Sequence, residues 1–217
     1  MIELLVLLVL AVFAYRSTYK INEDYFDVPK KLGIRMGKLW DIAQQSMREN
    51  KFLRAEKALL TILKIDEKNA AAYNRLGILY AKQKDYKDAI DCFEIASSIE
   101  KSASSFHNLG LIYYETGDYT RASLAFEEAI SLDDAMAARH IAYAKAQEKL
   151  GNSKKMISEL EKATKLEPNK ETYSLLLRAY EMNNMEEKAS TIRRRLSRVS
   201  LGSKRPKRVS RPPRVVV

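Results

Sequence analysis

The chain has 217 residues, 46% of them hydrophobic and 30% charged, which is typical of a globular protein and excludes a wholly disordered chain. Its net charge of +10 comes entirely from residues 193–217, which contain ten arginine and lysine residues and no acid, so that residues 1–192 carry no net charge. The body of the chain therefore lacks the charge of a nucleic-acid-binding domain, and any contact with a polyanion is expected in the tail.

The N-terminal segment, residues 1–19, predicts a membrane anchor. The uninterrupted apolar run Leu4–Ala14 would span about 16 Å as a helix, and extension over residues 1–19 gives about 28 Å, close to a hydrocarbon core of roughly 30 Å. Arg16 and Lys20 follow the run, and no basic residue precedes it. The positive-inside rule then places the N-terminus outside and the rest of the chain in the cytoplasm, as a single-pass membrane protein.

A cleaved signal peptide is the alternative for this segment, with Val12-Phe13-Ala14 as the cleavage site and an exported mature protein beginning at Tyr15. A signal peptide carries its basic residues before the apolar run, whereas this chain carries them after it. The order of charges favours the uncleaved anchor. Residues 20–35 are polar and contain Pro29 and Gly33, and we interpret them as a juxtamembrane linker.

A sequence repeat dominates the rest of the chain. No proline lies between Pro29 and Pro168, which favours helices throughout. Nine pairs of residues coincide at an offset of 33, and eight of the pairs are identical; the pairs are Tyr73/Phe106, Leu76/Leu109, Gly77/Gly110, Tyr80/Tyr113, Asp85/Asp118, Tyr86/Tyr119, Ala89/Ala122, Phe93/Phe126 and Ala96/Ala129. Their spacing predicts two amphipathic helices per unit.

Small residues in each unit have a packing role in this interpretation. Gly77 and Ala89, like Gly110 and Ala122, would let the paired helices approach closely where they cross, with aromatic rings filling the wider space on either side. Two glycine-containing dipeptides, Gly117-Asp118 and Gly151-Asn152, are expected to form turns between helices.

The pattern resembles the tetratricopeptide repeat, whose signature is W-x₂-L-G-x₂-Y…A-x₃-F…P with a period of about 34 residues. Residues 70–102 and 103–136 match it well, with YNRLGILY and FHNLGLIYY in their first helices. Flanking units are weaker but in phase. The resemblance implies an all-α solenoid of about five helix pairs over residues 36–199, divided into residues 36–69, 70–102, 103–136, 137–169 and 170–199, followed by a basic disordered tail over residues 200–217.

The resemblance also implies a concave groove lined by the first helices of successive repeats, with side chains one and five residues after the first framework position pointing into it. Those positions are Trp40, Gln44, Asn74, Ile78, His107, Leu111, Ile141 and Lys145, with Arg75, Asn108 and Tyr114 at the margin. This mixture of apolar and amide side chains suits an extended peptide or helix from a partner protein. Chaperone-binding members of the family clamp a carboxylate with Lys and Asn, and Trp40 and Gln44 stand at those places instead.

Three interpretations of the basic tail remain open. Its ten cations could bind RNA or the ribosome, could lie on anionic lipid, or could simply keep the chain soluble. They are Arg193, Arg194, Arg195, Arg198, Lys204, Arg205, Lys207, Arg208, Arg211 and Arg214. No aromatic residue accompanies them, so stacking on bases is not expected.

No catalytic motif is present, and we expect no enzyme and no cofactor. The sequence contains no Gly-rich phosphate loop, G-x-S-x-G, H-E-x-x-H or C-x-x-C motif, and one cysteine with two histidines is too few for a typical metal centre. We expect Asp133 and Asp134 to be solvated at a turn, and we expect His140 and Cys92 to pack in the core. The sequence therefore predicts a membrane-anchored scaffold that binds another protein.

Overall fold

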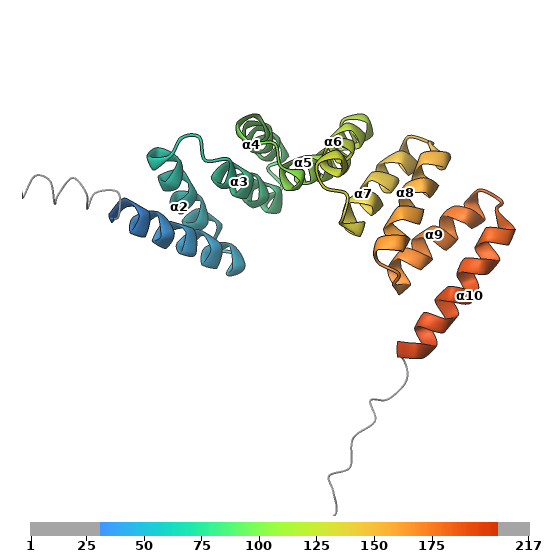
Figure 1. Ribbon diagram of the computed structural model, residues 1–217. Helices are drawn as coiled ribbons and strands as arrows, with labels where there is room; N and C mark the ends of the chain where they lie inside the picture. The colour runs from blue at the N-terminus through green and yellow to red at the C-terminus, as the bar shows by residue number, and fades with distance from the viewer. Residues whose placement is uncertain (1–30, 204–217) are drawn as a thin grey trace, which may run out of the picture. The chain divides into compact units, whose positions relative to one another are not determined.

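The computed structural model describes residues 31–203, and all regular structure in this part of the chain is helical (Figure 1). A first helix covers residues 31–48, so the last part of the predicted linker, residues 31–35, is helical. The others are α2 (Phe52–Ile65), α3 (Ala70–Gln83), α4 (Tyr86–Ile99), α5 (Ala103–Glu115), α6 (Tyr119–Leu132), α7 (Ala137–Lys149), α8 (Ser153–Leu166), α9 (Lys170–Met182) and α10 (Glu186–Ser203).

The helices belong to two compact units, the first ending at Lys84 and the second beginning at Asp85. This boundary falls inside the repeat predicted over residues 70–102, between its two helices. Gly77 is buried in the first unit, whereas Ala89 is buried in the second. The predicted close packing of Gly77 against Ala89 would be a contact between the two units, and it stays a prediction.

A left-handed residue marks the turn inside each helix pair and recurs at the period of the sequence repeat. Glycine adopts this conformation without strain, and asparagine tolerates it. The five positions are Asn50 (φ 56°), Lys84 (φ 67°), Gly117 (φ 84°), Gly151 (φ 77°) and Asn184 (φ 57°). The expected turns at Gly117 and Gly151 are confirmed, and Lys84 holds the same conformation without the freedom of glycine.

The next amide after several of these turns closes the preceding helix. The amide of Asp118 donates to the carbonyl of Tyr113 at 2.8 Å, and the amide of Asn152 donates to the carbonyl of Gln147 at 2.9 Å. Such bonds satisfy carbonyl groups that a helix end leaves without a partner. The turns therefore end one helix and direct the chain back along it.

Gly110 lies at a close contact between α5 and α6. A Cβ atom added at Gly110 would lie 2.6 Å from Cε1 and 2.7 Å from Cδ1 of Phe126. This confirms that glycine permits close helix packing in the repeat over residues 103–136. We expected the aromatic rings beside the crossing, but the ring of Phe126 lies directly against Gly110, because only a residue without a side chain leaves room for it.

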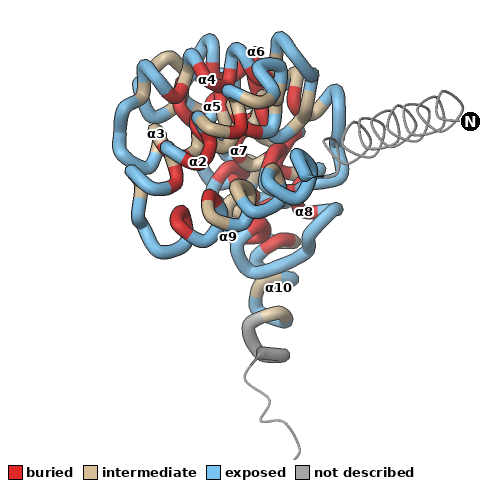
Figure 2. Tube along the Cα trace, turned by 90° about the vertical axis from the view of Figure 1, so that its left-hand side faces the viewer, coloured by how far each residue is buried: buried red, intermediate tan, exposed pale blue. Residues whose placement is uncertain are grey.

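Buried and exposed residues are interspersed along the helices, as expected for amphipathic helices (Figure 2). In the second unit, a cluster of buried apolar side chains connects α7, α8, α9 and α10. Its members include Ala144, Leu160, Leu176 and Ile192. This cluster holds α10 against the preceding helices.

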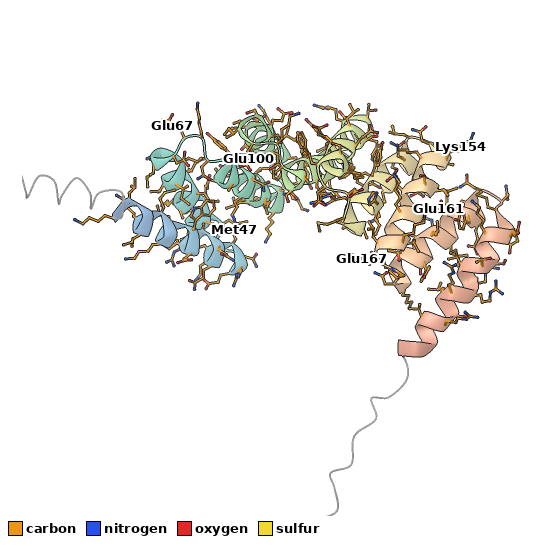
Figure 3. All side chains as sticks on the ribbon, viewed as in Figure 1. Met47, Glu67, Glu100, Lys154, Glu161 and Glu167 are labelled. Atoms are coloured by element: carbon orange, nitrogen blue, oxygen red, sulfur yellow. The ribbon has the colours of Figure 1, made fainter. Side chains whose placement is uncertain are left out.

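Tyrosine hydroxyl groups of first helices bond to acids on the preceding second helix. Tyr113 donates to Glu94 at 2.7 Å, and Tyr180 donates to Glu161, labelled in Figure 3, at 2.6 Å. Within the first unit, Tyr80 donates in the same way to Glu56 at 2.8 Å. These bonds join successive repeats through polar groups, in addition to apolar packing.

His140 is buried as expected, but it is not an ordinary packing residue. Its Nδ1 atom lies 2.7 Å from a carboxylate oxygen of Glu159, and both residues are almost fully buried, at 2% and 1% exposed. Its Nε2 atom lies 3.0 Å from the carbonyl oxygen of Asp134; because that oxygen can only accept, Nε2 carries a proton. Ring and carboxylate thus connect α7 to α8 and hold the loop before α7.

Asp133 is also more engaged than the sequence indicated. The guanidinium of Arg139, which is 5% exposed, bonds to both the carbonyl and the carboxylate of Asp133. This hydrogen bond lowers the pKa of the Asp133 carboxyl group. Asp133 and Asp134 are both exposed in the loop before α7, as expected. The loop has a further role that the sequence did not indicate, because it supplies partners to two buried polar side chains of α7.

The two ends of the described chain bear on the predicted anchor and tail. No helix within residues 31–203 is long and apolar enough to cross a membrane. The predicted anchor at residues 1–19 lies outside the described residues. At the other end, α10 continues to Ser203, into the segment assigned to the tail, because a helix held by packing extends at little cost.

Candidate protein-binding groove

Four of the predicted groove residues line one hollow in the second unit. His107 and Leu111 come from α5, and Ile141 and Lys145 come from α7. These helices present residues at i and i+4 on one face, which brings each pair to the same side. The hollow has a volume of about 290 Å³, and its other lining residues are Tyr114, Glu115, Phe126, Ala138, Ala142 and Glu171.

The inner part of the hollow is apolar and aromatic. The ring of Phe126 from α6 is 1% exposed, and its centroid lies 5.6 Å from that of His107. Leu111 is 39% exposed and Ile141 is half-buried, so both side chains present apolar surface to the hollow. An apolar side chain of a partner would bury Leu111 and displace water from this surface.

His107 is uncharged at neutral pH in this environment. Burial lowers the pKa of its imidazole, and the nearby Arg139 lowers that pKa further. Its Nδ1 atom is buried and has no hydrogen-bond partner among the described residues. The imidazole therefore contributes an aromatic face to the hollow rather than a positive charge.

The rim of the hollow carries both signs of charge. Lys145, Glu115 and Glu171 are exposed, and none of them makes an ion pair with another residue in the described part of the chain. Beyond Lys145, a smaller hollow of about 20 Å³ lies between α7 and α9. There Arg178 pairs with Glu148 at 2.9 Å, so that cation is already neutralised.

The other four predicted residues belong to the first unit. Trp40 is half-buried, and the guanidinium of Arg75 lies 5.7 Å from its ring centroid, in cation–π range. Gln44 is exposed, while Asn74 and Ile78 are half-buried. Arg75, expected at the margin, therefore partly covers the tryptophan that we expected to be open to a ligand.

The sequence did not indicate several lining residues of the hollow. Phe126 was assigned to the core, and Glu171 lies in the first turn of α9, far along the chain from Leu111. Glu115 follows Leu111 by four residues, so helical spacing alone could have identified it. The approach of α9 to this surface could not be inferred from spacing within one helix.

The basic residues of the tail are divided by the structure. Arg193, Arg194, Arg195 and Arg198 lie on α10 and are exposed. The remaining six, from Lys204 to Arg214, lie outside the described residues. The first four cations of the predicted basic segment therefore belong to a helix that packs against the second unit.

Neither a cluster of metal ligands nor a reactive thiol is found within residues 31–203. No group of three or more His, Cys, Asp or Glu side chains within residues 31–203 could hold a metal ion. The thiol of Cys92 is buried, and burial raises its pKa to about 11, so it is not a thiolate at neutral pH. The hollow described above remains the candidate functional site.

Comparison with protein families identifies the repeated unit. Residues 68–135 match a model described as tetratricopeptide repeat, and residues 138–170 match a second model with the same description. The chain contains tetratricopeptide repeats. No curated protein matches its sequence.

Solved structures share the fold of these repeats. A crystal structure of MamA protein is 21% identical, with a TM-score of 0.71, covering 83% of this chain and 100% of that one. A MamA structure from Desulfovibrio magneticus RS-1, beginning at residue 41, is 16% identical over 79% of this chain and 98% of that one, with a TM-score of 0.70. YrrB, described as a tetratricopeptide repeat protein with an unusual peptide-binding site, is 20% identical over 72% and 82%, with a TM-score of 0.62. At these identities the likeness shows a helical repeat solenoid.

Proposed function

We propose that this chain is a scaffold that binds a partner protein through the groove side of its first helices and catalyses no reaction of its own. The observation that carries the proposal is the convergence of His107, Leu111, Ile141 and Lys145 on one hollow. Two further facts support it: the tetratricopeptide repeats of the chain, and the peptide-binding site named in the description of YrrB. The division into five repeats over residues 36–199 is part of this proposal.

The chemistry of the hollow defines the segment that it would accept. The apolar floor and the exposed Leu111 favour one large apolar side chain of the partner. The exposed Lys145 would pair with an acidic residue beside it, while Glu115 and Glu171 would pair with a basic one. We therefore expect a short peptide with a large apolar residue flanked by charges of both signs.

We also propose that residues 1–19 anchor the scaffold in a membrane with the repeats on the cytoplasmic side. The support is the apolar run Leu4–Ala14 followed by Arg16. Confinement to a surface would raise the effective concentration of the groove for membrane-bound partners. Alkaline extraction of membranes and N-terminal sequencing test this; a soluble mature protein that begins at Tyr15 would support the exported alternative instead.

The binding proposal is tested with peptides selected from a random library on the full-length chain. Leu111→Asp should weaken the selected peptides at least tenfold, because burial of one apolar side chain contributes about 1.5–3 kcal/mol. Lys145→Ala should weaken those peptides that contain an acidic residue beside the apolar one.

The matched control is Leu124→Asp on the second helix α6, where Leu124 is 62% exposed and does not line the hollow. It makes the same chemical change on a different surface. If the Leu111→Asp variant melts at the wild-type temperature and binds the selected peptides as tightly as wild type does, the groove is refuted as the binding site.

A further inference from the structure

The four arginines of α10 differ in how their charges are compensated. Arg193 donates to Glu181 at 2.7 Å and to Glu186 at 3.1 Å, so two carboxylates neutralise it. The neighbouring Lys188 lies 3.6 Å from Glu161. None of the guanidinium groups of Arg194, Arg195 and Arg198 pairs with a carboxylate among residues 31–199. We name these three residues the arginine face.

The arginine face lies on a helix whose other side is fixed by packing. Ala189 and Ile192 of α10 are buried in the apolar cluster, and Leu196 packs against it. At about 100° per residue, Arg194 and Arg198 lie one turn apart on the side opposite these contacts. The two cations therefore project into solvent from a folded platform.

A fourth cation extends this charge onto the preceding helices. Arg195 and Lys165 line the same hollow of about 380 Å³ formed by α8, α9 and α10. Glu161 also lines it, but this acid pairs with Lys188. Lys165 is exposed at the end of α8. In the sequence, the arginine face is followed by six more basic residues and no acid. Positive charge is therefore concentrated at this end of the second unit, whereas residues 1–192 have no net charge.

We propose that the arginine face docks on a bilayer surface that contains anionic phospholipids. Phospholipid headgroups supply a dense layer of phosphate and carboxylate groups, and each arginine near such a surface contributes about 1 kcal/mol, or roughly a fivefold gain in partitioning. The apolar run Leu4–Ala14 is a second feature of the chain that favours a membrane. Single-stranded nucleic acid is favoured less, because residues 193–217 contain no aromatic side chain on which a base could stack.

The test compares flotation of the full-length chain with vesicles of phosphatidylcholine alone and of phosphatidylcholine mixed with phosphatidylserine. The ratio of the two partition coefficients isolates the anionic contribution, because an apolar segment inserts into both. The triple variant Arg194→Gln, Arg195→Gln, Arg198→Gln should lower this ratio by up to about 100-fold, as three fivefold factors. Replacement of the same three residues by lysine should largely preserve it, since the charge is kept.

The matched control is Arg48→Gln, Arg54→Gln, Lys57→Gln, which removes three exposed cations from the first unit. Its ratio should stay near that of wild type. An equal loss in this control, or an unchanged ratio in the glutamine triple variant, would overturn the proposal. If the glutamine triple variant of the arginine face loses binding to single-stranded RNA but keeps its binding to anionic vesicles, the proposal is also overturned and the arginine face is assigned to nucleic acid.

Discussion

Replacement of Gly110 by alanine tests the packing of α5 on α6 with a single methyl group. The new Cβ atom would lie 2.6 Å from the ring of Phe126, whereas carbon atoms in contact lie about 3.5–4.0 Å apart. The ring must therefore retreat by about 1 Å. Because Phe126 is 1% exposed, it cannot turn into solvent, and its neighbours must move with it.

The expected change in stability follows from two opposing effects. Overpacking of a filled core costs typically about 1–3 kcal/mol, while alanine is about 1 kcal/mol better than glycine inside a helix. Gly110→Ala should therefore lower the free energy of unfolding by about 1 kcal/mol. Gly110→Leu, with a larger side chain, should lower it by about 2–4 kcal/mol.

Gly37→Ala is the matched control, because a Cβ atom added at Gly37 meets nothing within 4 Å. It should raise the free energy of unfolding by about 0.5–1 kcal/mol through helix propensity alone. Urea unfolding followed by circular dichroism measures both variants. If Gly110→Ala stabilises the chain as much as Gly37→Ala does, the close packing against Phe126 is refuted.

Three further substitutions test the polar contacts and the turns. Tyr113→Phe removes the bond to Glu94 and should cost about 1 kcal/mol in urea unfolding. Burial, followed by that bond, raises the pKa of Tyr113 to about 12, so the folded state binds the phenolic proton more tightly than the unfolded state does. The resulting stabilisation should be present below about pH 10 and should be lost as the pH rises toward 12. The Phe variant, which has no phenolic proton, should not show this alkaline decline. Glu159→Ala leaves buried His140 without its partner and should cost about 3–5 kcal/mol by the same assay. Lys84→Gly should raise the free energy of unfolding by about 0.5–1 kcal/mol, and with it the midpoint of thermal unfolding, because glycine adopts a φ of 67° without strain.

Each of these predictions has a control or a contradicting result. Lys162→Ala removes only the exposed partner of Glu159 and should change stability by less than about 1 kcal/mol. An equal loss for Lys162→Ala and Glu159→Ala would argue against the buried pair. An identical alkaline decline for wild type and Tyr113→Phe would show that Tyr113 does not carry the pH effect. A lower midpoint for Lys84→Gly would contradict strain at this turn.

The sequence predicted the features that one helix pair determines by itself. The constant offset between matching residues revealed the paired helices, and Gly117 and Gly151 marked turns that need a left-handed residue. Gly110 indicated close packing, because glycine is otherwise unfavourable inside a helix. In each case a local steric requirement restricts the residue type, so the sequence retains a visible sign of it.

Features that depend on contacts between repeats were not predictable in the same way. Helical periodicity places Glu159 on the buried face of α8, three residues after Met156, but it gives no sign of the partner of the carboxylate, which is His140 from α7. Likewise, Glu171 reaches the hollow only because α9 packs beside α7. Such pairings join residues that are distant along the chain, and no spacing rule within a helix records them.

The most direct test of the binding function is site-specific photocrosslinking of the full-length chain in its native cells. A photoreactive residue at position 111 replaces Leu111 in the hollow, and one at position 124 replaces Leu124 outside it. We expect a discrete crosslinked partner at position 111 that an excess of a selected peptide removes, and no such product at position 124. Crosslinks that form only at position 124, or that form at position 111 and resist the peptide, would contradict binding in the groove.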